Sequence, residues 1–246
     1  MRRLHPSLVS WAALGLLVSV AAPARAQWYV EVFSGGAHTQ PATVSITEPA
    51  QGLSVEYHDV VFRSKPYAAD PYFGASLGRM LGKSRRLGVE FELIHLKVVA
   101  DTSQTYVTTP GPGGATIVTS FATMRDTVQR YQMTHGLNFA LANLVLRVPL
   151  RPGSDRVMLD VRAGAGPTIA HGETTVLGES RDGYGWGGVG ADAGVGVQIR
   201  LNGRIALMTG YQVTVARPTL ALAHGTGRAT ALSHHAMGGL TIALTR

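Results

Sequence analysis

Serine, histidine and carboxylate side chains are the residues of this sequence that could perform nucleophilic catalysis. Beyond the N-terminal segment, the closest approach of a serine to a histidine is Ser233-His234-His235. Residues two apart on a β-strand share a face, so Ser233 would lie beside His235, with Glu173 or Glu179 from a loop orienting the base. The same residues also fit a polar strand end, and their spacing favours this second interpretation.

Metal and cofactor chemistry has equally sparse candidates. His171-Gly172-Glu173 offers two ligands that zinc accepts, but a metal site needs a partner cluster, so a histidine at a loop mouth is the favoured interpretation. Cysteine is absent, which excludes zinc–thiolate sites and cysteine nucleophiles. No helical pattern follows the glycines of residues 187–196, so no nucleotide-binding loop is expected. We therefore expect no enzymatic activity, no metal and no cofactor.

The first 26 residues have the three parts of a secretory signal peptide. A basic start is followed by an apolar core at residues 8–22 and by the small-residue motif Ala-Arg-Ala. We expect cleavage between Ala26 and Gln27, leaving one domain over residues 27–246. Removing the leader, which holds three arginines and no acidic residue, lowers the formal net charge from +7 to +4. This charge is too small and too scattered to favour nucleic acid as a partner.

The elements that must position these side chains are strands. Apolar and polar residues alternate with a period of two, most clearly from Val189 to Ile199, and beyond the leader no stretch is apolar enough for a membrane helix. In two predicted strands the apolar residues change from odd to even positions, near Leu93 and near Asn143. This parity switch predicts a β-bulge or a membrane boundary at each point. The eight predicted strands cover about residues 28–37, 71–81, 86–99, 129–148, 156–171, 187–200, 204–216 and 229–244.

Short and long connections alternate strictly between these strands. Residues 82–85, residues 150–155 and the hairpin signal Asn202-Gly203 make short turns. An up-and-down barrel with turns at one rim and loops at the other would produce this order. The second loop contains TTPGPGGATIVTS and is expected to be flexible. The four long connections cover about residues 38–70, 100–128, 172–185 and 217–228.

The polar faces of the strands indicate which side of the barrel meets lipid. They are rich in glycine and alanine, and their charges have both signs, which suits the narrow lumen of an eight-stranded barrel. We therefore predict an all-β, eight-stranded antiparallel up-and-down transmembrane β-barrel, with a soluble lipocalin-type barrel as the alternative. The predicted lumen charge network consists of Glu31, Glu90, Glu92, Arg147, Asp160, Arg162, Asp192 and Arg200.

In several stretches the chain resembles the OmpA/OmpX-type family of small outer-membrane barrels. The matching stretches include WYVEVFSGG, PYFGASLGRML, LGVEFELIHL, VRAGAGPTIA and HHAMGGLTIAL. The resemblance implies a bacterial outer-membrane location and a salt-bridged interior plug that includes Glu90, Glu92 and Arg162. Members of the family usually end on an aromatic residue, whereas this sequence ends Leu244-Thr245-Arg246.

The expected function is a structural or surface-interaction role through four long extracellular loops, with the lumen largely plugged. The expected partners are outer-membrane lipid and lipopolysaccharide, the barrel-assembly machinery, and an extracellular ligand bound by the loops. Aromatic residues in the first loop, Tyr57, Phe62 and Tyr67 among them, suit such a contact. A narrow solute conduit and a lipid A-modifying enzyme are the alternatives.

Overall fold

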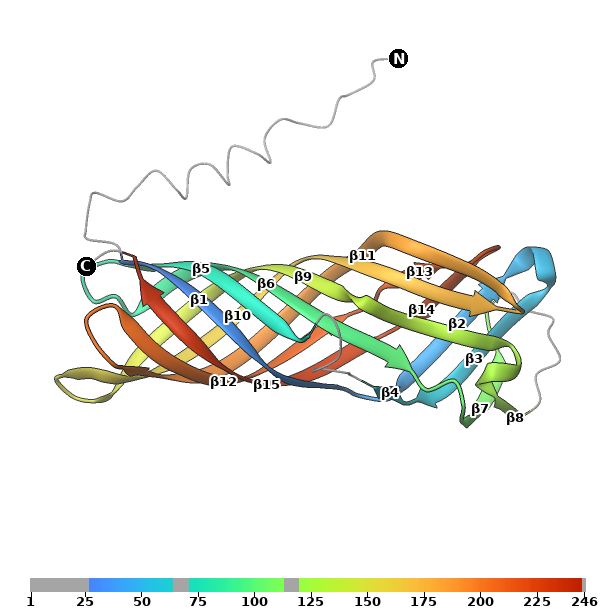
Figure 1. The fold of residues 1–246 in the computed structure, drawn as a ribbon, viewed down its shortest axis with the longest axis horizontal. Coiled ribbons are helices and arrows are strands. Elements are labelled where there is room, and N and C mark those ends of the chain that lie inside the picture. Colours follow the sequence, from blue (N-terminus) through green and yellow to red (C-terminus); the bar gives the residue numbers. More distant parts are fainter. Residues whose placement is uncertain (1–26, 64–70, 113–119, 245–246) are drawn as a thin grey trace, which may run out of the picture.

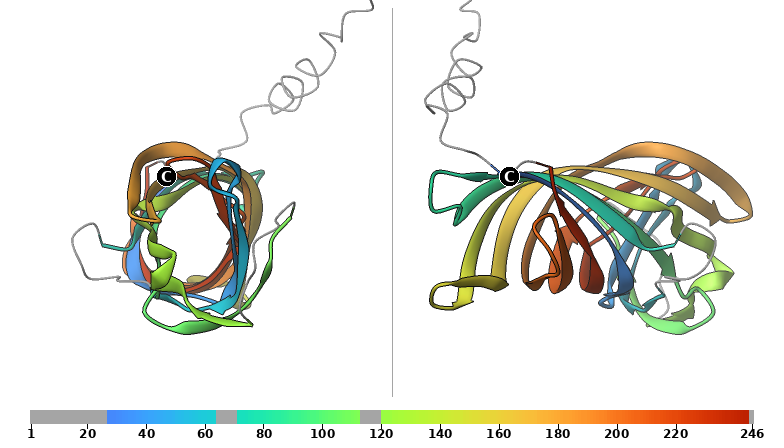
Figure 2. Two further views of the ribbon diagram at one scale, coloured as in Figure 1. Left: turned by 90° about the vertical axis from the view of Figure 1, so that its right-hand side faces the viewer. Right: turned by 60° about the vertical axis from the view of Figure 1, so that its left-hand side comes forward.

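Eight long strands form a closed antiparallel ring (Figures 1 and 2). The computed structural model describes residues 27–63, 71–112 and 120–244, so the predicted signal peptide and Ala26 lie outside the described residues. The ring follows the chain order from β1 to β15, and pairing of β1 with β15 closes it. The predicted eight-stranded up-and-down barrel is confirmed. Its strands are β1 (Gln27–Thr39), β5 (Phe73–Leu81), β6 (Leu87–Ala100), β9 (Val128–Arg151), β10 (Ser154–Val176), β11 (Glu179–Arg200), β12 (Ile205–Ala216) and β15 (Ala231–Ala243).

At the end of the barrel opposite the C-terminus, the long connections fold into a second sheet (Figure 1). Its strand order is β13-β14-β2-β3-β7-β8, and short 3₁₀ turns occupy Pro49–Gln51 and Met124–Asp126. Among the described residues, no helix is long and apolar enough to cross a membrane. The strands are β2 (Ala42–Glu48), β3 (Leu53–Val60), β7 (Thr105–Pro110), β8 (Phe121–Thr123), β13 (Thr219–Ala221) and β14 (Thr226–Ala229), and β4 (Phe62–Arg63) pairs with β6.

We call this second sheet the outer sheet. The loops fold because alternate apolar side chains, such as Val44 and Ile46 of β2 and Val55 of β3, pack into a core that continues into the barrel. Residues 113–119 of the predicted second loop, whose stretch TTPGPGGATIVTS was expected to be flexible, lie outside the described residues, as does Tyr67.

The predicted third loop is wrong. Residues 172–185 continue the ladder of β10 and β11 in pairs up to Val176 and Glu179, and only Leu177 and Gly178 form the turn. Both turn residues have positive φ, 50° and 84°, which is the backbone form that tight two-residue hairpins require. Pairing between β10 and β11 overrides the weak strand propensity of the glycines in this region.

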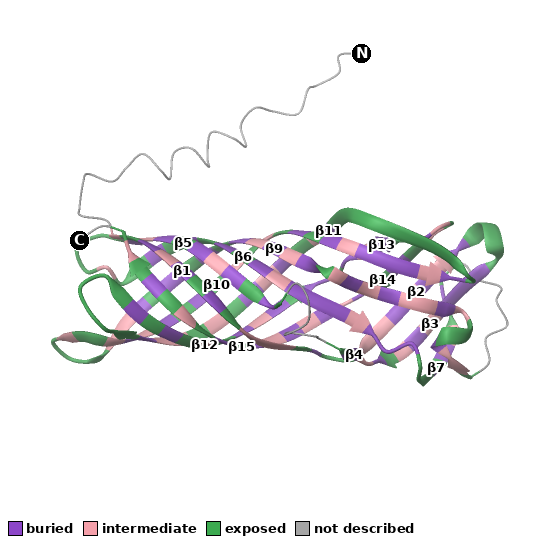
Figure 3. Cartoon of the chain, in the orientation of Figure 1, coloured by how far each residue is buried: buried purple, intermediate pink, exposed green. Residues whose placement is uncertain are grey.

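Buried and exposed residues alternate along the strands of the ring (Figure 3), so that successive side chains lie in the lumen and on the exterior. The four outward apolar residues of β6 from Leu87 to Leu93 are 44–62% exposed, while Gly88, Glu90 and Glu92 between them are buried. Large apolar side chains on the outside of a closed sheet match lipid and not water. The structure therefore excludes the lipocalin-type alternative.

Near Leu93 and Asn143 a β-bulge or a membrane boundary was predicted, and the β-bulge is wrong. Through Leu93, β6 pairs with β5 in unbroken register, and it pairs with β9 in the same way through Asn143. The apolar residues change to the other alternate positions because the filling of the lumen changes along the strand. On β6, the lumen-facing residues are Glu90 and Glu92 towards the short turns, and Ile94 and Leu96 towards the outer sheet. The register of β6 with β9 shifts only later, between Leu96 and Val98.

Gly78 of β5 makes room for the ring of Tyr29 inside the barrel. A Cβ atom at Gly78 would lie 2.1 Å from Tyr29 Cζ, whereas one at Gly36 would meet nothing within 4 Å. We expect Gly78→Ala to lower the free energy of unfolding by about 1–3 kcal/mol, because Tyr29 must leave its packed position. Gly36→Ala is the matched control, measured by urea unfolding in lipid vesicles. Equal midpoints for the two variants would contradict the prediction.

Candidate functional site

Arg162 lies at the centre of a buried charge cluster in the lumen. The residue projects inward from β10, and its Nη2 lies 2.9 Å from Glu31 Oε2. Its Nη1 lies 3.0 Å from Glu90 Oε1 and 3.4 Å from Glu92 Oε1. The three carboxylates come from β1 and β6, so one guanidinium joins strands from opposite sides of the ring across the barrel axis.

A second guanidinium, that of Arg147, lies beside this group. It makes a bidentate pair with Asp160, with both N–O distances 2.8 Å, and its Nη2 is 3.8 Å from Glu31. The Arg147 guanidinium also stacks over the ring of Tyr29 at 4.9 Å, and the Tyr29 hydroxyl donates to Glu90 at 2.8 Å. Charge-assisted bonds of this kind are stronger than neutral ones and fix the side chains in one arrangement.

Neutral amides complete the cluster. Gln198 donates to Glu31 at 2.6 Å, and Gln212 donates to Glu92 at 3.0 Å and to Asp192 at 2.7 Å. Among the described lumen residues named here, five carboxylates therefore face two guanidinium groups. These amides were missed by the sequence analysis, although they share the inward parity of the charged residues on their strands.

Arg200 does not belong to this cluster, and its assignment to the lumen network is wrong. It is the last residue of β11, its side chain is 45% exposed, and its nearest acidic partner is Asp155 at 3.6 Å. The parity of Arg200 is inward, but the strand ends there, so the side chain lies at the rim. Gln198, two residues earlier, takes the corresponding position inside the barrel. The other seven predicted network residues are buried.

The half of the lumen nearer the outer sheet has an apolar filling. Leu137, Phe139 and Leu141 of β9 are at most 1% exposed and belong to the same buried cluster as Val44 and Tyr57 of the outer sheet. The barrel interior therefore has two layers, a charged one towards the short turns and an apolar one towards the outer sheet. In the sequence, only the parity switches near Leu93 and Asn143 mark the boundary between the two layers.

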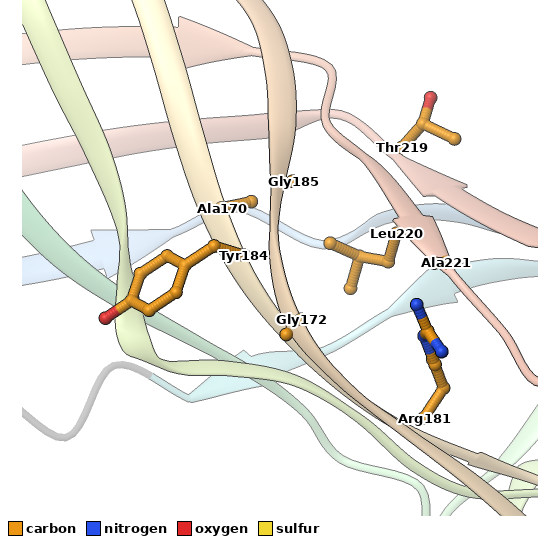
Figure 4. Close-up of a pocket in the computed structure, with 9 residues that line it drawn as sticks. Ala170, Gly172, Arg181, Tyr184, Gly185, Thr219, Leu220 and Ala221 are labelled. Carbon is orange, nitrogen blue, oxygen red and sulfur yellow. The ribbon is translucent and has the colours of Figure 1, made fainter.

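Two hollows at the outer end differ in size, and the one beside Asp101 and Arg125 measures about 240 Å³. A hollow of about 50 Å³ lies between the hairpin of β10 with β11 and strand β13 (Figure 4), room for only a few waters. Tyr184 and Arg181 of β11 and Leu220 of β13 line it. A hollow of this size does not accommodate a drug-sized ligand.

The candidate catalytic pair shares a face of β15 but is not assembled for catalysis. Ser233 and His235 are both 0% exposed, and His235 Nε2 pairs with Thr214 Oγ1 at 2.8 Å. Neither suggested carboxylate accompanies them, because Glu173 lies among the exterior histidines and Glu179 bonds to His224 at 2.8 Å. In the described part of the chain, these residues therefore do not form a serine–histidine–carboxylate triad.

His171 and Glu173 project from the exterior of β10, and the structure adds a third residue to them. His135 Nδ1 of β9 lies 3.3 Å from Glu173 Oε1, and His171 Nδ1 lies 3.9 Å from the same oxygen. The sequence analysis missed His135 because only the pairing of β9 with β10 brings it beside His171.

Asp101 joins the connections just beyond the outer end of β6. Its carboxylate accepts bonds from the Ser103 hydroxyl at 2.6 Å, from Gln104 at 2.8 Å and from Arg63 at 2.6 Å. Its carbonyl oxygen accepts the Tyr106 hydroxyl at 2.7 Å. These donors, the Ser103 hydroxyl foremost, hold the pKa of Asp101 well below its ordinary value against the opposing effect of burial.

We expect Asp101→Asn to lower the local stability of this region by about 1–3 kcal/mol, because donors that face the carboxylate lose their partner. The pKa of Asp101 is lowered in the folded state, so its contribution is complete above the unfolded value of about 3.9 and is lost as the pH falls below it. Amide hydrogen exchange at Ser103 and Gln104 measures the effect. Asp126→Asn, at an exposed position, is the control, and equal exchange in both variants would contradict the prediction.

No protein-family model matches the chain, and a search of curated proteins found no match. Solved structures do match. Neisserial surface protein A aligns at 10% identity over 87% of this chain and 96% of that chain, with a TM-score of 0.41. Outer membrane protein AlkL aligns at 10% identity over 100% and 98%, with a TM-score of 0.46. The outer membrane protease OmpT from Escherichia coli aligns at 7% identity over 92% and 99%, with a TM-score of 0.45. Similarity at this level says nothing about ligand or activity.

The location of the protein follows from its own surface. The ring is closed, so it leaves no strand edge in lipid, and its exterior carries a belt of exposed leucine, valine, isoleucine and phenylalanine side chains. The charged side chains of the Arg162 cluster face the lumen instead. The chain is therefore an integral β-barrel protein of the bacterial outer membrane.

Proposed function

We propose that the protein is a non-conducting outer-membrane barrel whose outer sheet contacts ligands or surfaces outside the cell. The observation that carries this proposal is the double filling of the lumen, with the Arg162 cluster in one half and an apolar core in the other. Because this core continues into the outer sheet, the barrel holds that sheet rigidly. Rigid scaffolds that carry exposed connecting segments are common sites of binding.

The outer end also carries apolar side chains that a contact surface would use. Val107 of β7 is 46% exposed, Phe121 of β8 is 66% exposed, and Leu177 in the turn after β10 is 46% exposed. The exterior belt would contact outer-membrane lipid and lipopolysaccharide, and insertion would require the barrel-assembly machinery. No cofactor is needed for this role.

Conductance separates this proposal from the narrow-conduit alternative. Purified protein in planar lipid bilayers should give no single-channel steps. Arg162→Ala combined with Phe139→Ala, which removes one side chain from each filling, should give steps that favour cations, because carboxylates would then outnumber guanidinium groups in a hydrated lumen still further. Arg200→Ala, at the rim, is the matched control and should remain silent. Conductance by the unaltered protein would favour the conduit.

Orientation can be tested with single cysteines, since the chain has none of its own. Ser180→Cys, near the β10–β11 turn, should react with a membrane-impermeant maleimide on intact cells. Ser84→Cys, in the short turn after β5, should react only after the outer membrane is permeabilised. The reverse result would place the outer sheet in the periplasm and contradict the proposed function.

Surface contact is tested by adhesion of cells that display the protein. We expect these cells to adhere more than empty-vector cells to at least one of three surfaces: polystyrene, immobilised lipopolysaccharide and a layer of the same cells. Phe121→Ser should reduce that adhesion, whereas Phe91→Ser on the lipid-facing belt should act only through the amount of protein inserted. Equal adhesion of displaying and empty-vector cells on all three surfaces would contradict the interaction role.

A further inference from the structure

We propose that His135, His171 and Glu173 form a binding site for a divalent transition-metal ion of the zinc class on the outer face of the barrel wall. One donor atom from each residue lies within 4.8 Å of the other two. Ligand atoms around tetrahedral zinc, each about 2.0–2.1 Å from the metal, lie about 3.4 Å apart. The site therefore closes with side-chain movements of about 1 Å, well within rotamer adjustment.

A bulge in β9 creates the site. Four residues of β9, 133–136, stand opposite only two residues of β10, 171–172. Gly136 within the bulge has φ +101°, a conformation that favours glycine. The extra residues turn His135 to the exterior, where it lies edge-on to the ring of His171 with the centroids 4.7 Å apart. Bulges commonly re-aim a side chain in this way.

His171 is oriented as a metal ligand. Its Nε2 lies 3.1 Å from Asp182 Oδ1 on β11, so the proton of the neutral imidazole is held at Nε2 and the lone pair remains on Nδ1. Nδ1 is buried and has no hydrogen-bond partner in the described part of the chain. It points towards Glu173 Oε1 at 3.9 Å. A carboxylate that orients the far nitrogen of a histidine is the usual outer shell of a zinc ligand.

Glu173 is held in place from its other side. Its Oε2 accepts a bond from Gln132 Nε2 at 2.8 Å and lies 3.8 Å from Arg130, which leaves Oε1 facing the two imidazole rings. The Thr134 hydroxyl also donates to Oε1. Two imidazoles with one carboxylate suit zinc, whereas magnesium and calcium prefer oxygen ligands throughout.

In the orientation on which the proposed function rests, the site is accessible from outside the cell. Ile169, two residues before His171 on the same face of β10, is 49% exposed and belongs to the apolar exterior, so the cluster lies at the outer edge of the lipid-facing belt. The His135 side chain is 55% exposed, which leaves a fourth coordination position open to water. On one side the ring of Tyr184 packs edge-on against His171 at 4.4 Å and limits its rotation.

Calorimetric titration of the folded mature barrel in detergent micelles with zinc chloride tests the proposal. We expect one zinc ion per barrel at micromolar concentrations, and no binding of magnesium chloride under the same conditions. His171→Gln and Glu173→Gln should each weaken zinc binding at least tenfold, because each removes a ligand. Asp182→Asn should weaken it by about 10–100-fold through the orientation of His171.

His224→Gln is the matched control. It also removes an exposed histidine bonded to a carboxylate, Glu179, but in the described residues that pair has no third donor. Its zinc affinity should equal that of the unaltered protein. Heat-dependent gel mobility verifies that every variant is folded, and His135→Gln provides a ligand variant at a solvent-exposed bulge. Absence of zinc binding, unchanged binding in the three ligand variants, or equal loss in His224→Gln would each overturn the proposal.

Discussion

Replacing Arg162 by methionine should lower the free energy of unfolding by about 3–5 kcal/mol, the usual cost of removing one partner from a buried ion cluster. The Arg162 side chain is 5% exposed, and the three carboxylates it contacts are buried, Glu31 and Glu92 completely. Without the guanidinium, these carboxylates repel one another in a low-dielectric space and must draw in water or protons. Urea unfolding and refolding in lipid vesicles measures the change.

Two further variants make the Arg162 prediction specific. Arg200→Met removes an arginine at the exposed rim and should change stability by no more than about 0.5 kcal/mol. Combining Arg162→Met with glutamine at positions 31, 90 and 92 should recover part of the loss, because no uncompensated charge remains in that group. A loss no greater than that of Arg200→Met would show that the cluster does not stabilise the barrel.

Phe139→Ala should cost a similar amount, about 3–5 kcal/mol, because it opens a cavity in the apolar layer that the barrel shares with the outer sheet. Phe139 is 1% exposed, and Gly190 of β11 leaves space for its ring: a Cβ there would lie 2.8 Å from it. We also expect the outer sheet to exchange its amide hydrogens faster, because Phe139 belongs to the same core as Val44 and Tyr57.

Phe91→Ala is the control for this prediction. Phe91 points outward from β6 and is 51% exposed, so its loss removes lipid contact without opening a cavity inside the protein. Its cost should be clearly smaller, and the amide exchange of the outer sheet should not change. If both phenylalanine variants destabilise the barrel equally and exchange in the outer sheet stays constant, the apolar layer does not connect the two parts.

The local sequence determined the strands of the barrel and the side of each strand that meets lipid. Alternation with a period of two depends only on neighbouring residues, so it identified Leu87 and Phe91 as outward and Glu90 and Glu92 as inward residues. Short turns such as Asn202-Gly203 then fixed the up-and-down order, since antiparallel strands joined by a tight turn must pair with each other.

Only the tertiary structure decided how the lumen and the outer end are filled. Contacts across the barrel axis, such as Arg162 with Glu31, and the rim position of Arg200 depend on where each strand ends in the closed ring. The parity switches near Leu93 and Asn143 arise from a change of filling, and no local signal distinguishes that change from a bulge.

The same limit applies to the exterior site. His135 meets His171 because a bulge that the sequence did not reveal lies opposite residues 171–172 of β10. The outer sheet likewise depends on pairing between segments far apart in the chain, β2 and β14 for example, whose ends lie side by side in the closed barrel. The alternation of apolar and polar residues and the residue types of the turns depend only on neighbours in the sequence. The strand register around the ring and the packing of the two lumen layers depend on the whole folded chain.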